Sequence, residues 1–249
     1  MINDKKIIVV ITARAGSKGI PMKNVRPLMG MPLFLWSVEA AKQSKYVDTI
    51  ILSTNCDRCK REWLEYVKSL DDKDSVKFIF IQRTEELSTD TSKNEDALIH
   101  AVNFCKDHYD LEYGIIVNLQ PTSPVRGNGL LDRCIEAYDE GGYDSLLTAK
   151  KDTPFLWQQV NGKWEYTVDK NHCCNRKMRQ EFKEDEFVWH DCGSVFITDK
   201  KVLLDIECRI GKNPCIFEVE GLDALQIDEE FDFSLIEQIA HVKDLKSLV

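Results

Sequence analysis

The chain has 249 residues, of which 33 are Lys or Arg and 42 are Asp or Glu, so its formal net charge is −9. Hydrophobic residues make up 43% of the chain and charged residues 30%, a mix that is typical of folded globular proteins and excludes a disordered chain. No apolar run approaches the roughly 20 residues of a membrane span, which excludes a membrane protein, and the acidic balance argues against nucleic acid as a partner bound by bulk electrostatics.

The first two thirds of the chain alternates between strand and helix patterns. Residues 6–13 form a continuous apolar, β-branched run, which indicates a strand buried on both faces. Further strands are predicted at 48–53, 76–82, 113–119 and 144–149. Helices are predicted at 32–44, 57–70, 92–108 and 130–139, the last closed by Gly141-Gly142. This order predicts an α/β fold with a mainly parallel sheet and helices on both faces.

The alternation breaks after residue 151. Residues 152–190 are rich in aromatic and charged side chains, and Asn161-Gly162 predicts a hairpin between 158–160 and 163–166. We interpret 152–190 as a small subdomain inserted into one domain that spans 1–249. Regular patterns return in two strands, 193–197 and 214–220, and in a helix at 229–248.

The chain contains nine cysteines, an odd number, and its first residues lack the hydrophobic region of a signal peptide. We therefore expect a cytoplasmic protein with reduced thiols. Cys56 and Cys59, together with the pair Cys173-Cys174, could instead form a zinc site. Four-cysteine sites usually show two CxxC pairs, and this chain has one, so incidental thiols are favoured.

Three polar segments directly follow predicted strands: 14–26, 83–90 and 120–126. In open α/β sheets, ligands bind outside the carboxyl ends of the strands. We therefore expect these segments, although far apart in the sequence, to line one crevice.

The first polar segment combines glycines with cations. Residues 13–24 (ARAGSKGIPMKN) place Arg14, Lys18 and Lys23 within ten residues beside two glycines. Backbone N–H groups in such a turn, with cations nearby, can bind phosphate oxygens. The spacing matches neither GxxxxGK[ST] nor GxGxxG. A solvated basic loop is the alternative, but the position directly after a buried strand favours a phosphate site.

The second and third segments each have a functional and a purely structural interpretation. In 83–92 (RTEELSTDTS), Arg83 could bind a base or a phosphate, whereas 89–92 equally predicts a plain N-cap for the next helix. In 119–126 (LQPTSPVR), two prolines stiffen a loop whose polar side chains could position a hydroxylated substrate. A proline-rich turn without a ligand is the alternative there.

The fourth segment is 226–232 (QIDEEFD). If it is extended, Gln226 and Asp228 face the same side. A carboxylate there could hold Mg²⁺, which prefers oxygen ligands and is often shared with substrate phosphates. The alternative is an acidic helix start, with Asp228 as the N-cap and Glu229 and Glu230 facing the positive end of the helix dipole.

Taken in order, these segments resemble the CMP-sialic acid synthetases, or acylneuraminate cytidylyltransferases, over nearly the whole chain. Residues 13–24 are similar to that family's first signature, and the matches continue through 83–90, 119–126 and 227–232. Arg179-Gln180 followed by 193–197 is similar to later family segments. The Kdo cytidylyltransferases carry an Arg-Leu-Pro version of the first loop and are less similar.

The resemblance implies a Rossmann-like, nucleotide-diphospho-sugar transferase type of fold. The implied reaction couples CTP to a 2-keto nine-carbon sugar acid of the sialic, legionaminic or pseudaminic type, and gives a CMP-sugar and pyrophosphate. In-line attack of the anomeric hydroxyl on the α-phosphate needs charge neutralisation and positioning rather than a covalent nucleophile. The alternatives are another nucleotide or acid, such as GTP or a Kdo-type sugar, and a nucleotide-binding homologue without catalysis.

The resemblance also implies roles for individual residues. The triphosphate would be held by Arg14, Lys18 and Lys23. The region around Ser17 would supply backbone donors to the triphosphate. The other nucleotide contacts would be Ala13, Asn24, Arg83, Ser92 and Asn94. The sugar acid would contact Gln120, Thr122, Ser123 and Arg179. The implied cofactor, Mg²⁺, would bind Asp228.

Family members dimerise through the inserted segment, so the resemblance implies a homodimer in which Arg179 reaches the neighbouring site and pairs with the sugar carboxylate. Three features depart from the family pattern, of which one is that the basic residue often found soon after the proline of the inserted segment is absent from 154–157 (PFLW). Gln226 stands where the family usually has Asp, which would weaken Mg²⁺ binding or leave it to waters and phosphates. Cys192 stands where the family usually has Asn, at a sugar contact.

Overall fold

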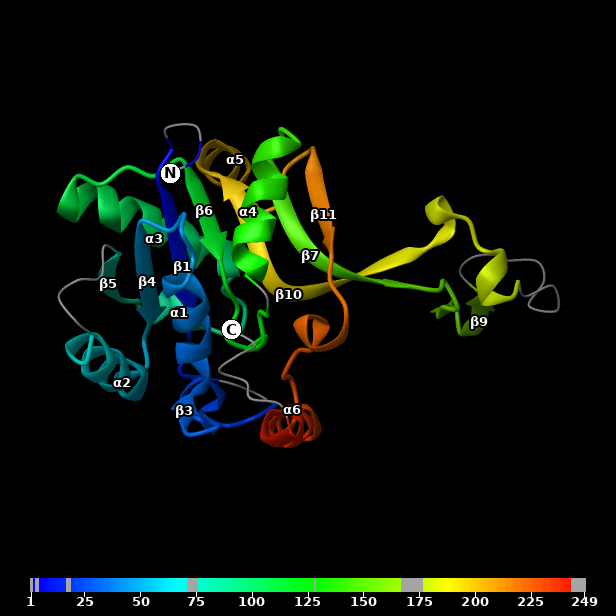
Figure 1. Cartoon of the computed structure of the whole chain (residues 1–249), viewed down its shortest axis with the longest axis horizontal. Coiled ribbons are helices and arrows are strands. Elements are labelled where there is room, and N and C mark those ends of the chain that lie inside the picture. The colour runs from blue at the N-terminus through cyan, green and yellow to red at the C-terminus, as the bar shows by residue number, and fades with distance from the viewer. Residues whose placement is uncertain are drawn as a thin grey trace.

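The computed structural model describes residues 2, 5–16, 19–70, 76–127, 129–166 and 177–242. Residues 241 and 242 are described by their backbone only. Its centre is a seven-stranded sheet with the strand order β11-β7-β10-β6-β1-β4-β5 (Figure 1). The strands are β1 (Ile7–Thr12), β4 (Thr49–Thr54), β5 (Lys77–Gln82), β6 (Ile115–Asn118), β7 (Ser145–Asp152), β10 (Val188–Asp199) and β11 (Pro214–Glu218).

Most neighbouring strands run parallel, which confirms the predicted sheet. Strand β1 pairs parallel with β4 and β6, β4 with β5, and β7 with β11. Strands β1, β4 and β6 are apolar and almost wholly buried, as expected of strands covered on both faces. The exception is β10, which runs antiparallel between β6 and β7.

Helices cover both faces of the sheet, also as predicted (Figure 1). Side chains of α1, α2 and α4 pack on one face, and those of α3 and α5 on the other. Helix α6 packs outside α1 in a third apolar cluster that includes Ile227. The helices are α1 (Leu33–Lys42), α2 (Asp57–Lys68), α3 (Asn94–Tyr109), α4 (Leu130–Glu140), α5 (Lys200–Ile206) and α6 (Glu230–Val242). Helix α4 ends as predicted, with Gly142 at a φ of 61°.

The structure corrects several predicted elements. The strand expected at 193–197 is the inner half of β10, which begins at Val188 inside the segment interpreted as irregular. Helix α5 was not predicted, because its seven residues form only two turns and show little periodicity. The short hairpin of β2 (Pro27–Leu28) and β3 (Met31–Pro32) takes up the start expected for the first helix. Of the last helix, predicted at 229–248, residues 243–249 lie outside the described residues.

A slender arm projects from the body (Figure 1). Its stem consists of the outer halves of β7 and β10, which pair from Ala149–Asp191 to Asp152–Val188. The predicted hairpin is confirmed as β8 (Trp157–Val160) and β9 (Lys163–Tyr166), with Asn161 and Gly162 at φ values of 51° and 78° in its turn. Two short 3₁₀ turns, η4 (Arg179–Glu181) and η5 (Glu184–Glu186), complete its described part.

The helices of the described chain include none long and apolar enough to cross a membrane.

Candidate active site

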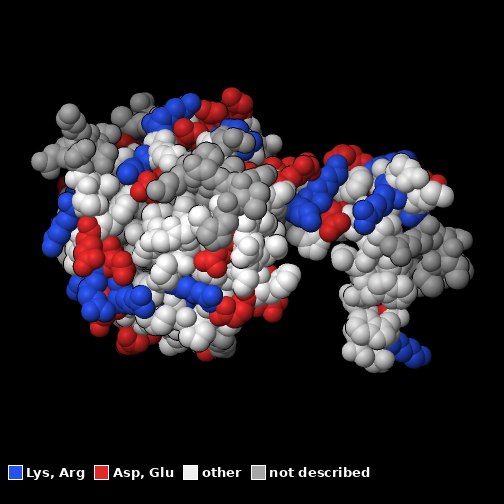
Figure 2. All heavy atoms as spheres, turned by 60° about the horizontal axis from the view of Figure 1, so that its bottom comes forward, with Lys and Arg blue, Asp and Glu red and all other residues white. Residues whose placement is uncertain are grey.

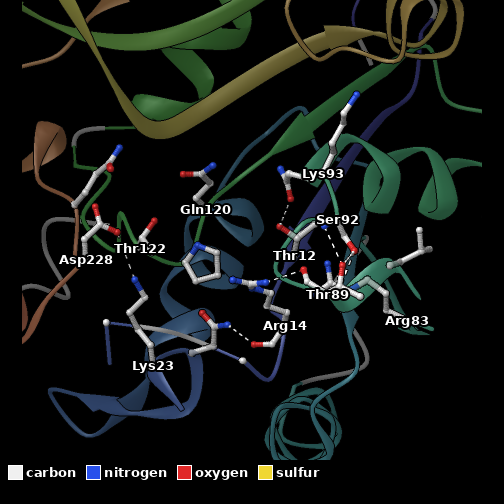
Figure 3. A pocket seen from close by; sticks show the side chains of 17 residues that line it. Thr12, Arg14, Lys23, Arg83, Thr89, Ser92, Lys93, Gln120, Thr122 and Asp228 are labelled. Carbon is white, nitrogen blue, oxygen red and sulfur yellow. Dashed lines mark hydrogen bonds and ion pairs between the residues drawn. The ribbon is translucent and has the colours of Figure 1, made fainter. Parts of the chain in front are cut away.

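A pocket of about 450 Å³ opens at the carboxyl ends of the parallel strands, where the polar segments meet (Figure 3). Four of its lining residues are cations, and one, Asp228, carries a carboxylate, so the pocket is electropositive although the chain is acidic. The lining residues are Thr12, Arg14, Gly16, Gly19, Lys23, Asn24, Arg83, Leu87, Thr89, Ser92, Lys93, Asn94, Gln120, Pro121, Thr122, Gln226 and Asp228.

The loop after β1 is fixed on both sides by hydrogen bonds. The Arg14 guanidinium donates to the Thr89 carbonyl at 2.8 Å and pairs with Asp90 at 2.9 Å. The Asn24 side chain donates to the Arg14 carbonyl at 3.0 Å, and the Ala15 N–H donates to Asn55 at 2.9 Å. The loop is therefore held in shape before any ligand arrives.

Lys23 connects this loop to the segment before α6. It lies in the 3₁₀ turn η1 (Lys23–Val25), and its Nζ donates to the Ile227 carbonyl at 2.6 Å and lies 3.5 Å from the Asp228 carboxylate. Gly19 packs so closely that a Cβ there would lie 2.2 Å from the Asp228 backbone oxygen. The phosphate-type loop and Asp228 thus form one unit.

Arg83 is a buried cation with unpaired donors. Its side chain lines the pocket although the residue is 5% exposed, and its Nε and Nη2 have no hydrogen-bond partner among the described residues. Burial, followed by the charge of Arg14, lowers the pKa of Arg83 to about 10, so it stays protonated at neutral pH. Buried donors are almost always satisfied in folded proteins. The pair left open here indicates an acceptor supplied by a ligand.

A chain of hydrogen bonds joins the strand ends on the same side of the pocket. The Thr12 hydroxyl donates to Asn94 at 2.7 Å, and the Asn94 amide donates to Asn118 at 2.7 Å. Asn118 in turn donates to the Val10 carbonyl at 2.9 Å. These contacts fix the side chain of Asn94, the first residue of α3, which lines the pocket.

The opposite wall is held by the buried side chain of Arg126. It donates to the carbonyls of Ser194 and Gln120 at 2.9 and 2.7 Å, and to the Ser37 hydroxyl at 3.1 Å. Burial lowers the pKa of Arg126 to about 9. These contacts tie the loop after β6 to the inner half of β10 and so fix the backbone that carries Gln120.

The sequence was compared with models of known protein families. The model of a family described as Cytidylyltransferase matches residues 8–186. The chain belongs to the cytidylyltransferase family. As such it is a nucleotidyltransferase, and the matched region contains every pocket segment except the one that carries Gln226 and Asp228.

Individual relatives agree with this assignment. The cytidylyltransferase is 24% identical to the post-translational flagellin modification protein B of Campylobacter coli, across 97% of this chain and 98% of that protein. It is 27% identical to N-acylneuraminate cytidylyltransferase A of Danio rerio and 25% identical to the N-acylneuraminate cytidylyltransferase of an Escherichia coli strain. These two alignments cover 94% and 98% of this chain, but only 50% and 54% of the two relatives. The chain thus spans about half their length.

Solved structures with little sequence identity share the fold. A CMP:2-keto-3-deoxy-manno-octonic acid synthetase complexed with CTP aligns with a TM-score of 0.66 at 16% identity, over 95% of this chain and 99% of that one. A 4-diphosphocytidyl-2C-methyl-D-erythritol synthase from Anaerococcus prevotii aligns with a TM-score of 0.65 at 13% identity, over 96% and 98%. These likenesses place the cytidylyltransferase in the predicted class of Rossmann-like folds.

The structure brings most of the predicted site residues of the cytidylyltransferase together. Those that line the pocket are Arg14, Lys23, Asn24, Arg83, Ser92, Asn94, Gln120, Thr122 and Asp228. Ala13 and Ser123 are wholly buried behind the wall, where the Ser123 hydroxyl donates to the Cys192 carbonyl at 3.0 Å. Arg179 lies on the arm and does not line this pocket. Ser17 and Lys18 lie outside the described residues.

Two structural alternatives considered for these segments are wrong. Helix α3 begins at Asn94, and Ser92 does not cap it; its hydroxyl instead donates to the Glu86 carbonyl at 2.7 Å. Asp228 is not the N-cap of α6, which begins at Glu230. The Asp232 carboxylate accepts from the N–H groups of residues 228 and 229, each at 2.9 Å. The Asp228 carboxylate does not cap the helix and lies instead at the pocket, 3.5 Å from Lys23.

Sequence reasoning missed several lining residues. Thr12 and Lys93 are direct neighbours of predicted site residues, and adjacency to the strand end or the helix start is the signal that could have found them. Thr89 lies three residues before Ser92, in a segment interpreted only as a possible helix cap. Gln226 was considered only as a weakened metal ligand. Its place in the wall depends on Gly193, which no local pattern reveals.

The described residues include no group of three or more His, Cys, Asp or Glu side chains placed to hold a metal ion. Cys56 and Cys59 are buried free thiols, while Cys173 and Cys174, their predicted zinc partners, lie outside the described residues. A single exposed carboxylate at Asp228 nevertheless fits Mg²⁺, which is commonly held by one or two carboxylates plus substrate phosphates and waters.

Proposed function

We propose that the chain couples CTP to a nonulosonic acid, a 2-keto nine-carbon sugar acid, and releases pyrophosphate. The observation that carries this proposal is the electropositive pocket at the strand ends, with the unpaired donors of Arg83 buried in it. The names of the N-acylneuraminate cytidylyltransferase relatives support the acceptor class, and the CTP-complexed structural neighbour supports the nucleotide.

In this proposal the loop after β1 binds the triphosphate. Arg14, Lys18 and Lys23 would neutralise phosphate charge, and the residues around Ser17 would supply backbone N–H groups. Arg83 donates to an acceptor on the cytidine, and Asn24, Ser92 and Asn94 fix the base and ribose. Ala13, which is wholly buried, supports this wall from behind instead of contacting the nucleotide. The preformed bonds of Arg14 and Asn24 mean that little ordering is needed on binding.

The acceptor then lies against the wall formed by Gln120 and Thr122, with Ser123 supporting that wall from behind. Its anomeric oxygen forms a bond to the α-phosphorus while the bond from this phosphorus to the bridging oxygen breaks. Pyrophosphate leaves with the bonding pair, and the hydroxyl proton passes to solvent. Charge neutralisation by the fixed cations and alignment of the two substrates carry the catalysis.

Mg²⁺ is the cofactor of this proposal. Asp228 would hold it together with the phosphates, where it would add Lewis-acid neutralisation of phosphate charge. Lys23 lies 3.5 Å from the same carboxylate, so the Asp228 side chain is already oriented toward the phosphate loop.

The test is pyrophosphate release from CTP and Mg²⁺ with a panel of sialic, legionaminic and pseudaminic acids, and with Kdo as a control acid. A parallel panel of nucleotides that includes GTP tests the nucleotide. We expect release with CTP and at least one nine-carbon acid. Release only with Kdo or only with GTP would overturn the assigned substrates, and CTP binding without release for any acid would identify a non-catalytic homologue.

We further propose a homodimer formed through the arm. Its hairpin exposes Trp157 and Trp164 by 52% and 68%, and Met178 on the neighbouring segment is 62% exposed. Figure 2 shows charged residues gathered where the arm leaves the body and a largely uncharged described surface further along it. Large apolar surfaces of this kind mark interaction sites. Arg179, on this arm, would bind the acid carboxylate in the partner's pocket.

Subunit mixing tests this arrangement. Lys23→Ala and Arg179→Ala are expected to be nearly inactive as separate proteins. In a hybrid dimer, the site that retains Lys23 receives Arg179 from the other subunit, so one of its two sites is intact. An equimolar, re-equilibrated mixture should therefore regain about a quarter of the unmodified activity. No recovery in a mixture shown to contain hybrid dimers would contradict a role for Arg179 across subunits.

A further inference from the structure

Gln226 lines the pocket two residues before Asp228, and the buried Ile227 between them anchors the segment. The Ile227 N–H donates to the Thr122 carbonyl at 2.7 Å, while its own carbonyl accepts from Lys23. Gln226 is therefore held on rigid backbone, between the loop that carries Gln120 and the loop that carries Lys23.

Gly193 brings Gln226 beside Gln120. This glycine has a φ of 61° in the irregular part of β10, between Asp191 and Phe196. A Cβ at Gly193 would lie 2.3 Å from Gln120 Oε1 and 2.7 Å from Gln226 Nε2. The two amides thus occupy the space that the side chain of any other residue would fill, next to each other on one wall of the pocket.

The chemistry of this wall differs from that of the rest of the pocket. The lining cations come from the loop after β1 and from the segments around Arg83 and Lys93, whereas the two glutamines are uncharged. Each primary amide offers two donors and one acceptor oxygen. Two adjacent amides therefore suit hydroxyl and acylamino groups, which donate and accept, better than phosphate or a metal ion.

We propose that Gln226 and Gln120 form a paired amide subsite for the uncharged hydroxyl and acylamino substituents of the sugar acid, and that Gln226 contributes to the choice among acids. Gln226 thereby belongs to the acceptor half of the site rather than to the metal. This assignment rests on the proposed function, because it presupposes a sugar-acid acceptor.

The experiment compares Gln226→Ala and Gln226→Asp with the unmodified protein. The matched control is Gln238→Ala, which removes an exposed glutamine of α6 outside the pocket. Two measurements are made on each variant. Steady-state kinetics gives the KM of the best acid of the panel, the KM of CTP and kcat. Calorimetry gives the affinity for CTP as Mg²⁺ is varied, without any turnover.

For Gln226→Ala we expect the KM of the acid to rise about tenfold, the loss of one or two hydrogen bonds to uncharged groups. The KM of CTP and the Mg²⁺ dependence of CTP binding should stay within about twofold of the unmodified values. The preference among acids with different substituents should narrow. Gln226→Asp should also lose affinity for the acid, without needing less Mg²⁺.

A lower Mg²⁺ requirement together with a higher kcat in Gln226→Asp would overturn the assignment and make position 226 a metal position. An unchanged acid KM in Gln226→Ala would overturn it as well. If the unmodified protein turns over no acid, the proposed function fails. Calorimetry still tests the role of Gln226 in that case. A shift in the Mg²⁺ dependence of CTP binding in Gln226→Ala would show that Gln226 takes part in Mg²⁺ binding and would refute the assignment.

Discussion

The pocket and the arm differ in how far their side chains find partners within the chain. Around the pocket, side chains donate to backbone carbonyls of distant segments, as Arg14 does to Thr89 and Lys23 to Ile227. On the arm, the largest apolar side chains, such as Trp157 and Trp164, are left exposed. A region whose contacts are complete within one chain needs no second subunit to bind a nucleotide, whereas a region that exposes apolar surface suits contact with a partner, as in the proposed homodimer. Variants in the body should therefore alter CTP binding and chemistry, and variants in the arm should alter assembly and acid use.

The largest effect is expected from Lys23→Ala. This change removes a cation that lines the pocket, lies 2.6 Å from the Ile227 carbonyl, and would bind phosphate in the proposed function. Turnover should fall about 100- to 1,000-fold, the usual cost of losing one preorganised electrostatic contact. Pyrophosphate release measures the loss, and an unchanged circular dichroism spectrum shows that the fold survives. Near-normal turnover would remove Lys23 from the site.

Arg83→Met should separate binding from stability. CTP affinity should fall about 10- to 100-fold, because charge-assisted hydrogen bonds to the nucleotide are lost. The ligand-free protein should be as stable as before or more stable, since a buried cation with unpaired donors is removed. Burial lowers the Arg83 pKa only to about 10, so this gain should not vary with pH around neutrality.

For Arg83→Met, calorimetry gives the affinity for CTP, and chemical denaturation gives the free energy of unfolding of the ligand-free protein. A variant that is clearly less stable without ligand would show that Arg83 supports the fold rather than the ligand. Arg61→Met, a change at an exposed residue of α2 outside the pocket, serves as the control for general effects of removing a cation.

Gly19→Ala tests the contact between the phosphate loop and Asp228. The new Cβ would lie 2.2 Å from the Asp228 backbone oxygen, so one of the two segments must move. We expect a loss of about 1–3 kcal/mol in the free energy of unfolding, typical of overpacking, together with weaker CTP binding. Gly16→Ala is the matched control, because a Cβ there meets nothing within 4 Å. Equal stability of the two variants would contradict the close packing.

The smallest effect on CTP binding is expected from replacing both Trp157 and Trp164 by Glu. Light scattering should show dissociation, because two charges replace apolar surface at the proposed interface. CTP affinity should stay within about twofold, since the pocket lies in the body. Lys163→Glu in the same hairpin controls for added negative charge. A large loss of CTP affinity would break the separation between the two regions.

The sequence alone predicts those features that depend on local signals. The apolar run at 6–13 identified the buried central strand, and the polar segments after each strand identified most of the pocket. The Asn161-Gly162 pair identified the hairpin of the arm. In each case a few neighbouring residues carry the information.

Features that depend on distant pairing could not be predicted. The outer half of β10 is aromatic and charged, and it is a strand only because it pairs with β7. The neighbourhood of Gln226 is set by Gly193, and that of Gln120 by Arg126. These contacts join residues from separate segments of the chain. The pattern within any one segment does not reveal which other segment it will contact.

The shared strands of the stem also constrain how such an arm can change its length. Strand β10 runs for 12 residues from the arm into the sheet, paired with β7 on the way. Inserting one residue into either strand would turn every later side chain of that strand to the other face of the stem. Insertion of two residues into both strands would restore the faces and move the tip outward by about 7 Å. The reach of the arm can therefore evolve only in discrete steps, while the pocket at its base stays the same.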